Sequence, residues 1–349
     1  MVSAVLQTSF LGDMVLTTPL LERLAREGPV HVVATPANAG VLAHHPAVAS
    51  VIVFDKRRSD AGWRGFNRVA ARLRETGATR AYLAQGSMRT AALAWYARIP
   101  ERIGFGRSAG RLLYSKRVHY RADWHHAARL WSLASQTDAA PGERAPSLRP
   151  SLYPGADDQA HVHALLSGEG IAEDMPLIAL APGSVWATKR WPHYPALAAA
   201  LLEEAAAHHS LTGARLVVIG AATDAPLAAA IADRVKASGA HHTAVVDATG
   251  KLSLLGSAAL LSRCRLLVTN DSAPLHLASA MNTPTVALFG PTVPSLGFGP
   301  LAERQAVMGM ELACRPCHAH GPQQCPLVHW NCMRTMTAEQ VARQAAGLA

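Results

Sequence analysis

Residues 267–292 read Leu-Val-Thr-Asn-Asp-Ser-Ala-Pro-Leu-His-Leu-Ala-Ser-Ala-Met-Asn-Thr-Pro-Thr-Val-Ala-Leu-Phe-Gly-Pro-Thr and contain the clearest structural pattern of the chain. An apolar strand at 266–268 is followed by a helix of small residues and by a second apolar strand at 285–289. Two strands joined by a helix form a βαβ unit, and in open α/β sheets ligands bind beyond the carboxyl ends of the strands. Polar or turn-forming residues stand at both of these ends: Asn270, Asp271, Ser272 and Gly290.

The start of this helix favours an anionic ligand. Asp271 or Ser272 can cap it, and its free N–H groups and positive dipole end suit a phosphate. His276 follows one turn later and is a candidate for the same site. Taken alone, the segment fits a capped helix with a buried, hydrogen-bonded histidine equally well.

Residues 178–192, Ile-Ala-Leu-Ala-Pro-Gly-Ser-Val-Trp-Ala-Thr-Lys-Arg-Trp-Pro, repeat the order of strand, Gly/Ser loop and helix start. Backbone amides near Gly183 and Ser184 can hold a phosphate, while Thr188 and Lys189 supply a hydroxyl and a cation. A third strand at 215–220 ends in another small-residue turn. Three strand ends in one half of the chain thus offer contacts to phosphate or ribose.

Length and composition predict two α/β domains. A chain of 349 residues exceeds one typical core, and half of its residues are apolar while 16% are charged. Strands alternate with helices both before and after a Pro/Gly/Ser/Ala-rich linker at 137–158. We expect domains at 1–155 and 156–335, and a helical tail at 336–349. Apolar runs are too short to span a bilayer and the N-terminus lacks signal-peptide features, which favours a cytoplasmic protein.

Three blocks spread along the chain carry a family resemblance: Thr8-Ser9-Phe10-Leu11-Gly12-Asp13, Thr188-Lys189-Arg190-Trp191-Pro192, and Asn270-Asp271-Ser272 through Gly290-Pro291-Thr292. Together they resemble the bacterial ADP-heptose:lipopolysaccharide heptosyltransferases, in the manner of heptosyltransferase II. The resemblance implies the GT-B fold, in which two Rossmann-like domains with parallel sheets face each other across a central cleft. It also implies that the C-terminal tail returns to the first domain.

The resemblance implies an inverting transfer of heptose from ADP-heptose to the inner core of lipopolysaccharide, with no metal or other cofactor required. Asp13 matches the proposed general base, although its position after the first strand equally suits a helix cap. Lys189 matches a ligand of the departing diphosphate. The donor-binding set is Gly183, Ser184, Thr188, Lys189, Gly250, Lys251, Leu252, Asn270, Asp271, Ser272, His276 and Gly290.

Charge is concentrated in the first half of the chain. Residues 56–129 hold 17 basic and 4 acidic side chains, whereas residues 166–349 hold 12 of each. A basic surface attracts polyanions or an anionic membrane, and the resembled acceptor is acidic through its Kdo sugars and lipid A phosphates. The resemblance therefore implies peripheral contact with the cytoplasmic face of the inner membrane. The predicted acceptor contacts are Ser9, Arg57, Arg58, Arg64, Arg89 and Arg102.

Four cysteines near the C-terminus, Cys314, Cys317, Cys325 and Cys332, are spaced C-x₂-C-x₇-C-x₆-C. In a reducing compartment this spacing fits either a structural zinc site or packed, reduced thiols.

Two other function classes fit parts of the pattern. One is a different GT-B enzyme, either a transferase or an epimerase that uses another nucleotide sugar. The other is a nucleic-acid-binding protein without enzymatic activity. Against the second, the sequence has no helix-turn-helix or RNA-binding motif, and aromatic residues make up only 5% of it. We therefore expect no nucleic-acid partner.

Overall fold

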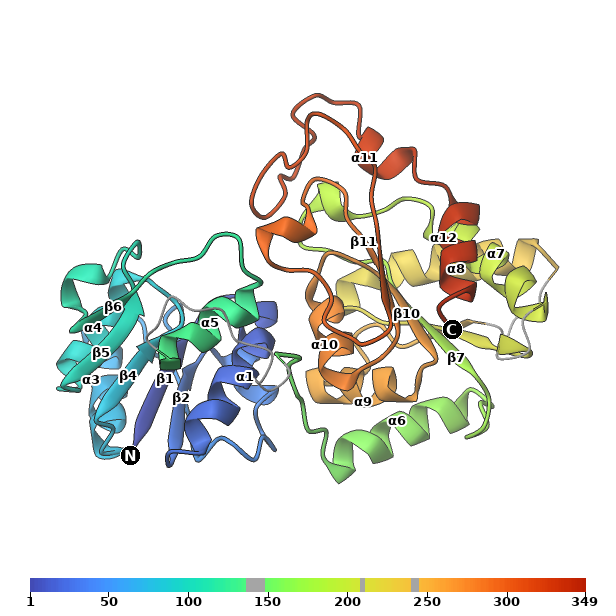
Figure 1. The fold of residues 1–349 in the computed structure, drawn as a ribbon. Coiled ribbons are helices and arrows are strands. Elements are labelled where there is room, and N and C mark those ends of the chain that lie inside the picture. The colour runs from blue at the N-terminus through green and yellow to red at the C-terminus, as the bar shows by residue number, and fades with distance from the viewer. Residues whose placement is uncertain (136–147, 208–210, 240–244) are drawn as a thin grey trace. The chain divides into compact units, whose positions relative to one another are not determined.

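The computed structural model describes residues 1–135, 148–207, 211–239 and 245–349. It divides the chain into two compact units, Met1–Tyr153 and Pro154–Ala349. Each unit is built on a six-stranded sheet in which every strand pair is parallel (Figure 1). The predicted α/β class with two Rossmann-like sheets is thereby confirmed. Residues 137–147 of the predicted linker lie outside the described residues.

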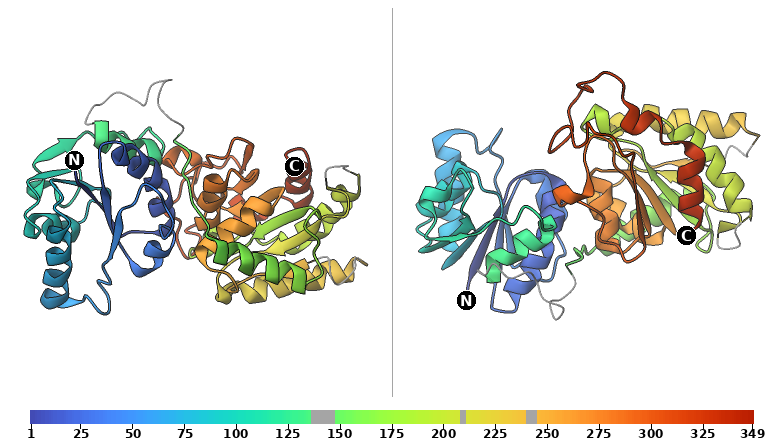
Figure 2. Two further views of the ribbon diagram at one scale, coloured as in Figure 1. Left: turned by 90° about the horizontal axis from the view of Figure 1, so that it is seen from below. Right: turned by 45° about the horizontal axis from the view of Figure 1, so that its top comes forward.

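The first sheet has the strand order β3-β2-β1-β4-β5-β6. Helices α3 and α4 cover one face, where an apolar core forms with the strands, and α1, α2 and α5 cover the other (Figures 1 and 2). The strands are β1 Ser3–Gln7, β2 Val30–Ala34, β3 Ser50–Val53, β4 Arg80–Leu83, β5 Glu101–Phe105 and β6 Lys116–Val118. The helices are α1 Leu11–Ala25, α2 Pro36–Gly40, α3 Gly62–Glu75, α4 Met88–Tyr96 and α5 His126–Ser135, with a 3₁₀ turn η1 at Arg111–Leu113.

The second sheet has the strand order β12-β11-β10-β7-β8-β9. Its strands are β7 Leu177–Ala181, β8 Arg215–Val218, β9 Val245–Asp247, β10 Leu266–Asn270, β11 Thr285–Leu288 and β12 Gln305–Met308. Its helices are α6 Ala156–Gly168, α7 Tyr194–Ala207, α8 Ala225–Ala237, α9 Leu254–Arg263, α10 Ala273–Met281, α11 Asn331–Arg334 and α12 Ala338–Ala346. Short 3₁₀ turns are η2 Ala187–Lys189, η4 Ala222–Asp224 and η6 Pro294–Leu296.

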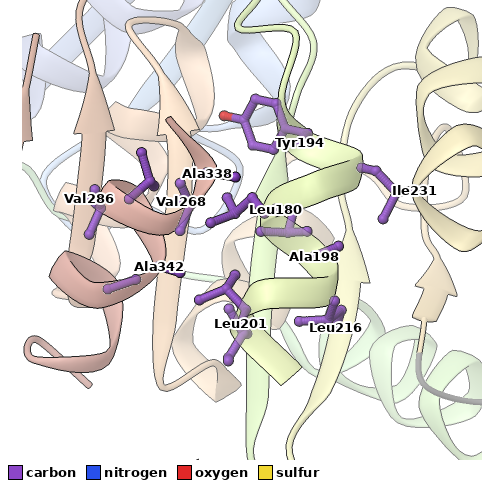
Figure 3. Packing of buried hydrophobic residues seen from close by; sticks show 14 of the residues in the cluster. Leu180, Tyr194, Ala198, Leu201, Leu216, Ile231, Val268, Val286, Ala338 and Ala342 are labelled. Atoms are coloured by element: carbon purple, nitrogen blue, oxygen red, sulfur yellow. The ribbon is translucent and has the colours of Figure 1, made fainter. Parts of the chain in front are cut away.

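The C-terminal helix α12 belongs to the second unit, so the expectation that the tail returns to the first domain is wrong. Figure 3 shows Ala338 and Ala342 of α12 packed into the same core as Leu180 of β7 and Leu201 of α7. The apolar residues of α12 lie on one face of the helix and are fully buried against this core. Because burial of that apolar face stabilises the second unit, the tail stays there.

His45 makes the stability of the first unit depend on pH. Its side chain is buried against Tyr153, and burial lowers its pKa to about 4. Between about pH 6.5 and 4 the unfolded chain binds a proton that the folded unit rejects, so the free energy of unfolding falls as pH falls, by about 3 kcal/mol in total. We expect His45→Gln to flatten this dependence in urea unfolding followed by circular dichroism. An equally steep fall in the variant would contradict the assignment.

None of the helices in the described ranges is both long enough and apolar enough to cross a membrane.

Candidate functional site

Each sheet has one point where the chain reverses the direction in which strands are added. In the first sheet this point lies between β1 and β4, and in the second between β7 and β10. Ligands of open α/β sheets bind beyond the carboxyl ends of the strands at such points. Polar side chains from the two adjacent strand ends meet at both of these points. Thr8 donates to Gln85 in the first unit, and Lys189 pairs with Asp271 in the second.

Asp13 lies in the first turn of α1, directly after β1. Phe10 is the N-cap of this helix and no side chain caps it, so the alternative role of Asp13 as the cap is not seen. Instead, Ser9 Oγ lies 2.6 Å from Asp13 Oδ2 and donates a hydrogen bond to it. The carboxylate is 17% exposed, which keeps it open to a ligand.

His126, the first residue of α5, is a neighbour of Asp13 that the sequence did not single out. Its Nε2 lies 3.5 Å from Asp13 Oδ1. Burial lowers the pKa of His126, and the positive charge of Arg129 lowers it further, against the opposing effect of Asp13. A neutral imidazole that donates from Nε2 can orient the carboxylate without cancelling its charge. No motif signals this residue, because α5 joins α1 only through tertiary packing.

A basic cluster lies at the same edge of the first sheet. Lys56, which the sequence did not single out, donates to Thr8 O at 2.9 Å. Burial lowers the pKa of Lys56, and the charges of Arg57 and Arg89 lower it further. The proximity of these three cations fits the predicted acceptor role of Arg57 and Arg89. Arg58 lies exposed in the same loop, between β3 and α3.

The two remaining predicted arginines, Arg64 and Arg102, differ in their positions. Arg64 is exposed in the first turn of α3. Arg102 stands near the amino end of β5, level with Ala81, which in turn pairs with Ala4. Its guanidinium donates to the carbonyls of Ile99, Pro100 and Leu113. Arg102 therefore lies at the sheet edge opposite Asp13 and is bound internally, and its contact with the acceptor stays a prediction.

Lys189 and Asp271 form a buried pair beyond the carboxyl ends of β7 and β10. Lys189 Nζ lies 2.6 Å from Asp271 Oδ2, and the two side chains are 10% and 8% exposed. Thr292, which follows β11, donates to the same oxygen at 2.6 Å. An ammonium has three donors, of which Asp271 takes one, so Lys189 retains donors for a phosphate. Three segments far apart in the sequence thus converge.

The segment between β12 and α11 holds the loop that carries Lys189 (Figure 1). Thr188 donates its hydroxyl to Pro322 O, and Gln323 Nε2 donates to Val185 O at 3.1 Å. Thr188 is only 3% exposed. The Thr188 hydroxyl fixes this segment to the loop, and a contact of its side chain with the donor stays a prediction.

Asn270 has a structural role, and its predicted donor contact stays a prediction. Its side chain is fully buried, and its amide donates to Pro182 O at 2.8 Å. Its oxygen accepts from Trp191 N at 3.3 Å and from Tyr194 Oη at 3.4 Å. Asn270 thereby ties the loop after β7 to β10 and positions the neighbouring Asp271.

The predicted glycines are explained by close packing. A Cβ at Gly183 would lie 2.3 Å from the carboxylate of Asp224, and one at Gly290 would lie 2.7 Å from Met333. The side chain of Met333 in α11 therefore packs closely against Gly290. Gly250 has φ +67° and donates its N–H to Gly220 O at 2.9 Å, which joins the turns after β8 and β9.

The other predicted donor residues lie at the same edge of the second sheet. Ser272 is the N-cap of α10, and its hydroxyl donates to Asn270 O at 3.3 Å, so no side chain caps the helix. His276 is 5% exposed and packs edge-on against Phe298. Ser184 accepts from Trp186 N at 3.3 Å. Lys251 is exposed and Leu252 is half-buried in the turn after β9.

All five cysteines are free thiols. Cys314 Sγ lies 3.9 Å from His329 Nε2, and burial raises the pKa of Cys332 to about 11. In the ranges that the structure covers, no three His, Cys, Asp or Glu side chains are arranged to hold a metal ion. Arg315, within the cysteine-rich stretch, instead binds the loop after β11 through Phe289 O and Thr292 O, both at 2.9 Å.

The chain is similar to curated heptosyltransferases over most of its length. It is 29% identical to lipooligosaccharide heptosyltransferase 2 of Haemophilus ducreyi, covering 86% of each chain. It is also 29% identical to lipopolysaccharide heptosyltransferase 1 of Pseudomonas aeruginosa, covering 89% of this chain and 84% of that protein. The fold superposes on ADP-heptose LPS heptosyltransferase II of Escherichia coli with a TM-score of 0.75 at 24% identity, covering 99% and 97% of the two chains.

Residues 66–327 match glycosyltransferase family 9 (heptosyltransferase), which is more than half of the chain. The chain therefore belongs to this heptosyltransferase family and is a glycosyltransferase.

Proposed function

We propose that the protein transfers heptose from ADP-heptose to the acidic inner core of lipopolysaccharide, with inversion at the anomeric carbon and in the manner of heptosyltransferase II. The observation that carries this proposal is a pair of half-sites, one at the point in each sheet where the strand order reverses. One offers the partly exposed carboxylate of Asp13, and the other offers the cation of Lys189 beside an uncapped helix N-terminus.

In the proposed reaction, the acceptor hydroxyl attacks the anomeric carbon while Asp13 takes its proton. The bond between the anomeric carbon and the diphosphate oxygen breaks, and ADP leaves with the bonding electrons. Lys189 and the N–H groups of α10 stabilise the charge that develops on the diphosphate. For this reaction both half-sites must act on the same pair of substrates.

The residues around each reacting group have supporting roles in this scheme. Ser9 and His126 hold the Asp13 carboxylate from opposite oxygens. Lys56, Arg57 and Arg89 provide positive charge for the acid groups of the acceptor. Because side chains and backbone dipoles supply the positive charge, we propose that the transfer requires no metal ion. The acceptor is a membrane lipid, and we propose that the enzyme works at the cytoplasmic leaflet of the inner membrane.

Incubation with ADP-heptose and defined truncated core acceptors, read by mass spectrometry, tests this function. We expect an added heptose on one acceptor and release of ADP, with turnover unchanged by EDTA. A thermal-shift panel separates the alternatives: ADP should raise the melting temperature, whereas UDP-sugars or oligonucleotides should not. Stabilisation by UDP-sugars alone would indicate a different GT-B enzyme, and stabilisation by oligonucleotides alone would indicate the nucleic-acid-binding protein.

A further inference from the structure

A cluster of aromatic side chains stands open on the outer surface of α3 and α4, which lie side by side on one face of the first sheet (Figures 1 and 2). Phe66 stacks on Trp63 with 5.6 Å between ring centroids, and Tyr96 contacts both rings edge-on at 5.5 Å and 5.0 Å. Trp95 extends the cluster, 5.1 Å from Tyr96. We call these four residues the aromatic patch.

Three side chains of the aromatic patch are unusually exposed to water for large, mainly apolar residues. Trp63 is 58% exposed, Trp95 is 50% exposed and Tyr96 is 37% exposed. Soluble proteins seldom leave contiguous apolar surface of this kind open to water, and such patches mark interaction sites. Trp and Tyr are also the side chains that concentrate at the boundary between a bilayer and water, because each ring has an apolar body and a polar atom.

Arginines border the aromatic patch. Arg74 of α3 donates to Tyr96 O at 2.6 Å, and together with Trp95, Tyr96, Arg98 and Arg102 it lines a depression of about 470 Å³. No acidic side chain lines this depression among the residues that the structure describes. Helix α3 itself carries four arginines and one glutamate. The surface therefore combines aromatic rings with excess positive charge.

We propose that the aromatic patch and its bordering arginines dock the enzyme on a bilayer containing anionic phospholipid. The guanidinium groups of Arg74 and Arg98 meet lipid phosphates, which attract basic side chains near the membrane surface. The rings of Trp63, Trp95 and Tyr96 enter the headgroup layer. The positive charge favours a lipid surface over an apolar protein partner. Lipid phosphates pair with the arginines directly, whereas a buried protein interface would have to supply a carboxylate for each of them. The inference rests on the proposed function only in that the acceptor is itself a membrane lipid.

Vesicle flotation tests the docking surface without either substrate. The purified full chain is mixed with vesicles of equimolar phosphatidylcholine and phosphatidylglycerol, or of phosphatidylcholine alone. We expect binding to the anionic vesicles that weakens with salt, and a loss of ~10-fold or more in partitioning for the double variant Trp63→Ser, Trp95→Ser. Arg98→Gln should weaken binding to anionic vesicles only.

The matched control is Leu112→Ser, which removes a side chain that is 73% exposed on η1 of the same unit. This control should bind vesicles like the parent, and the tryptophan variant should retain transfer to a water-soluble truncated acceptor. Unchanged flotation of the double variant would overturn the proposal. Light scattering that shows a dimer for the parent and a monomer for the variant would also overturn it, by identifying the patch as a self-association surface. Normal flotation with no transfer activity would refute the proposed function alone.

Discussion

Replacement of Asp13 by asparagine is expected to lower turnover by ~10²–10⁴-fold, the usual contribution of a general base. The amide has nearly the shape of the carboxylate, and its oxygen still accepts the hydrogen bond from Ser9. It cannot accept a proton from the acceptor hydroxyl. Because Asp13 does not cap α1, the substitution should leave the stability of the helix close to normal. Initial rates at saturating ADP-heptose and acceptor provide the measurement.

Binding of ADP serves as the check that the donor site is intact in Asp13→Asn. ADP binding should be unchanged in calorimetry, because the predicted donor residues all belong to the second unit. Asp233→Asn, an exposed position on α8, is the control for loss of a carboxylate and should keep full turnover. If Asp13→Asn turned over at the parental rate, the proton would have to go elsewhere, and Asp13 would have no catalytic role.

The sequence predicted well those features that local patterns encode. Strand ends followed by glycine or small polar residues located the edge of the second sheet, where Lys189, Asp271 and Thr292 meet. The βαβ pattern fixes which edge of a parallel sheet these residues occupy. The role of Asp13 came from the family resemblance, because its position after the first strand equally suited a helix cap.

Tertiary packing gives several of the predicted site residues structural partners that the sequence does not indicate. Asn270 and Thr188 have the polarity of ligand contacts, but their partners are backbone carbonyls of Pro182 and Pro322, distant in sequence. Arg102 was chosen from charge alone, and charge does not indicate which end of a strand a side chain occupies. His126 was missed because its meeting with Asp13 depends on the packing of α5 against α1.

Replacement of Lys189 by alanine is expected to weaken ADP binding by roughly 10- to 100-fold, because a hydrogen bond to a charged group contributes ~1.5–3 kcal/mol. Calorimetric titration with ADP measures this loss directly. Lys236→Ala is the matched control. Lys236 is an exposed lysine in the last turn of α8 and lies outside the predicted donor-binding set, so its loss should leave ADP binding unchanged.

Lys189→Ala should also lower the stability of the second unit, and this effect must be separated from the loss of ADP binding. Lys189→Ala leaves the buried Asp271 carboxylate without its cation, and an uncompensated buried charge of this kind costs about 3–5 kcal/mol of stability. The double variant Lys189→Ala, Asp271→Asn removes that charge and should recover much of the lost melting temperature. If Lys189 binds the diphosphate, the double variant should regain stability while ADP binding stays weak. Parental ADP affinity in the double variant would show that Lys189 serves only to neutralise Asp271, and the diphosphate ligand would have to be sought among the N–H groups of α10 and the loop at Gly183.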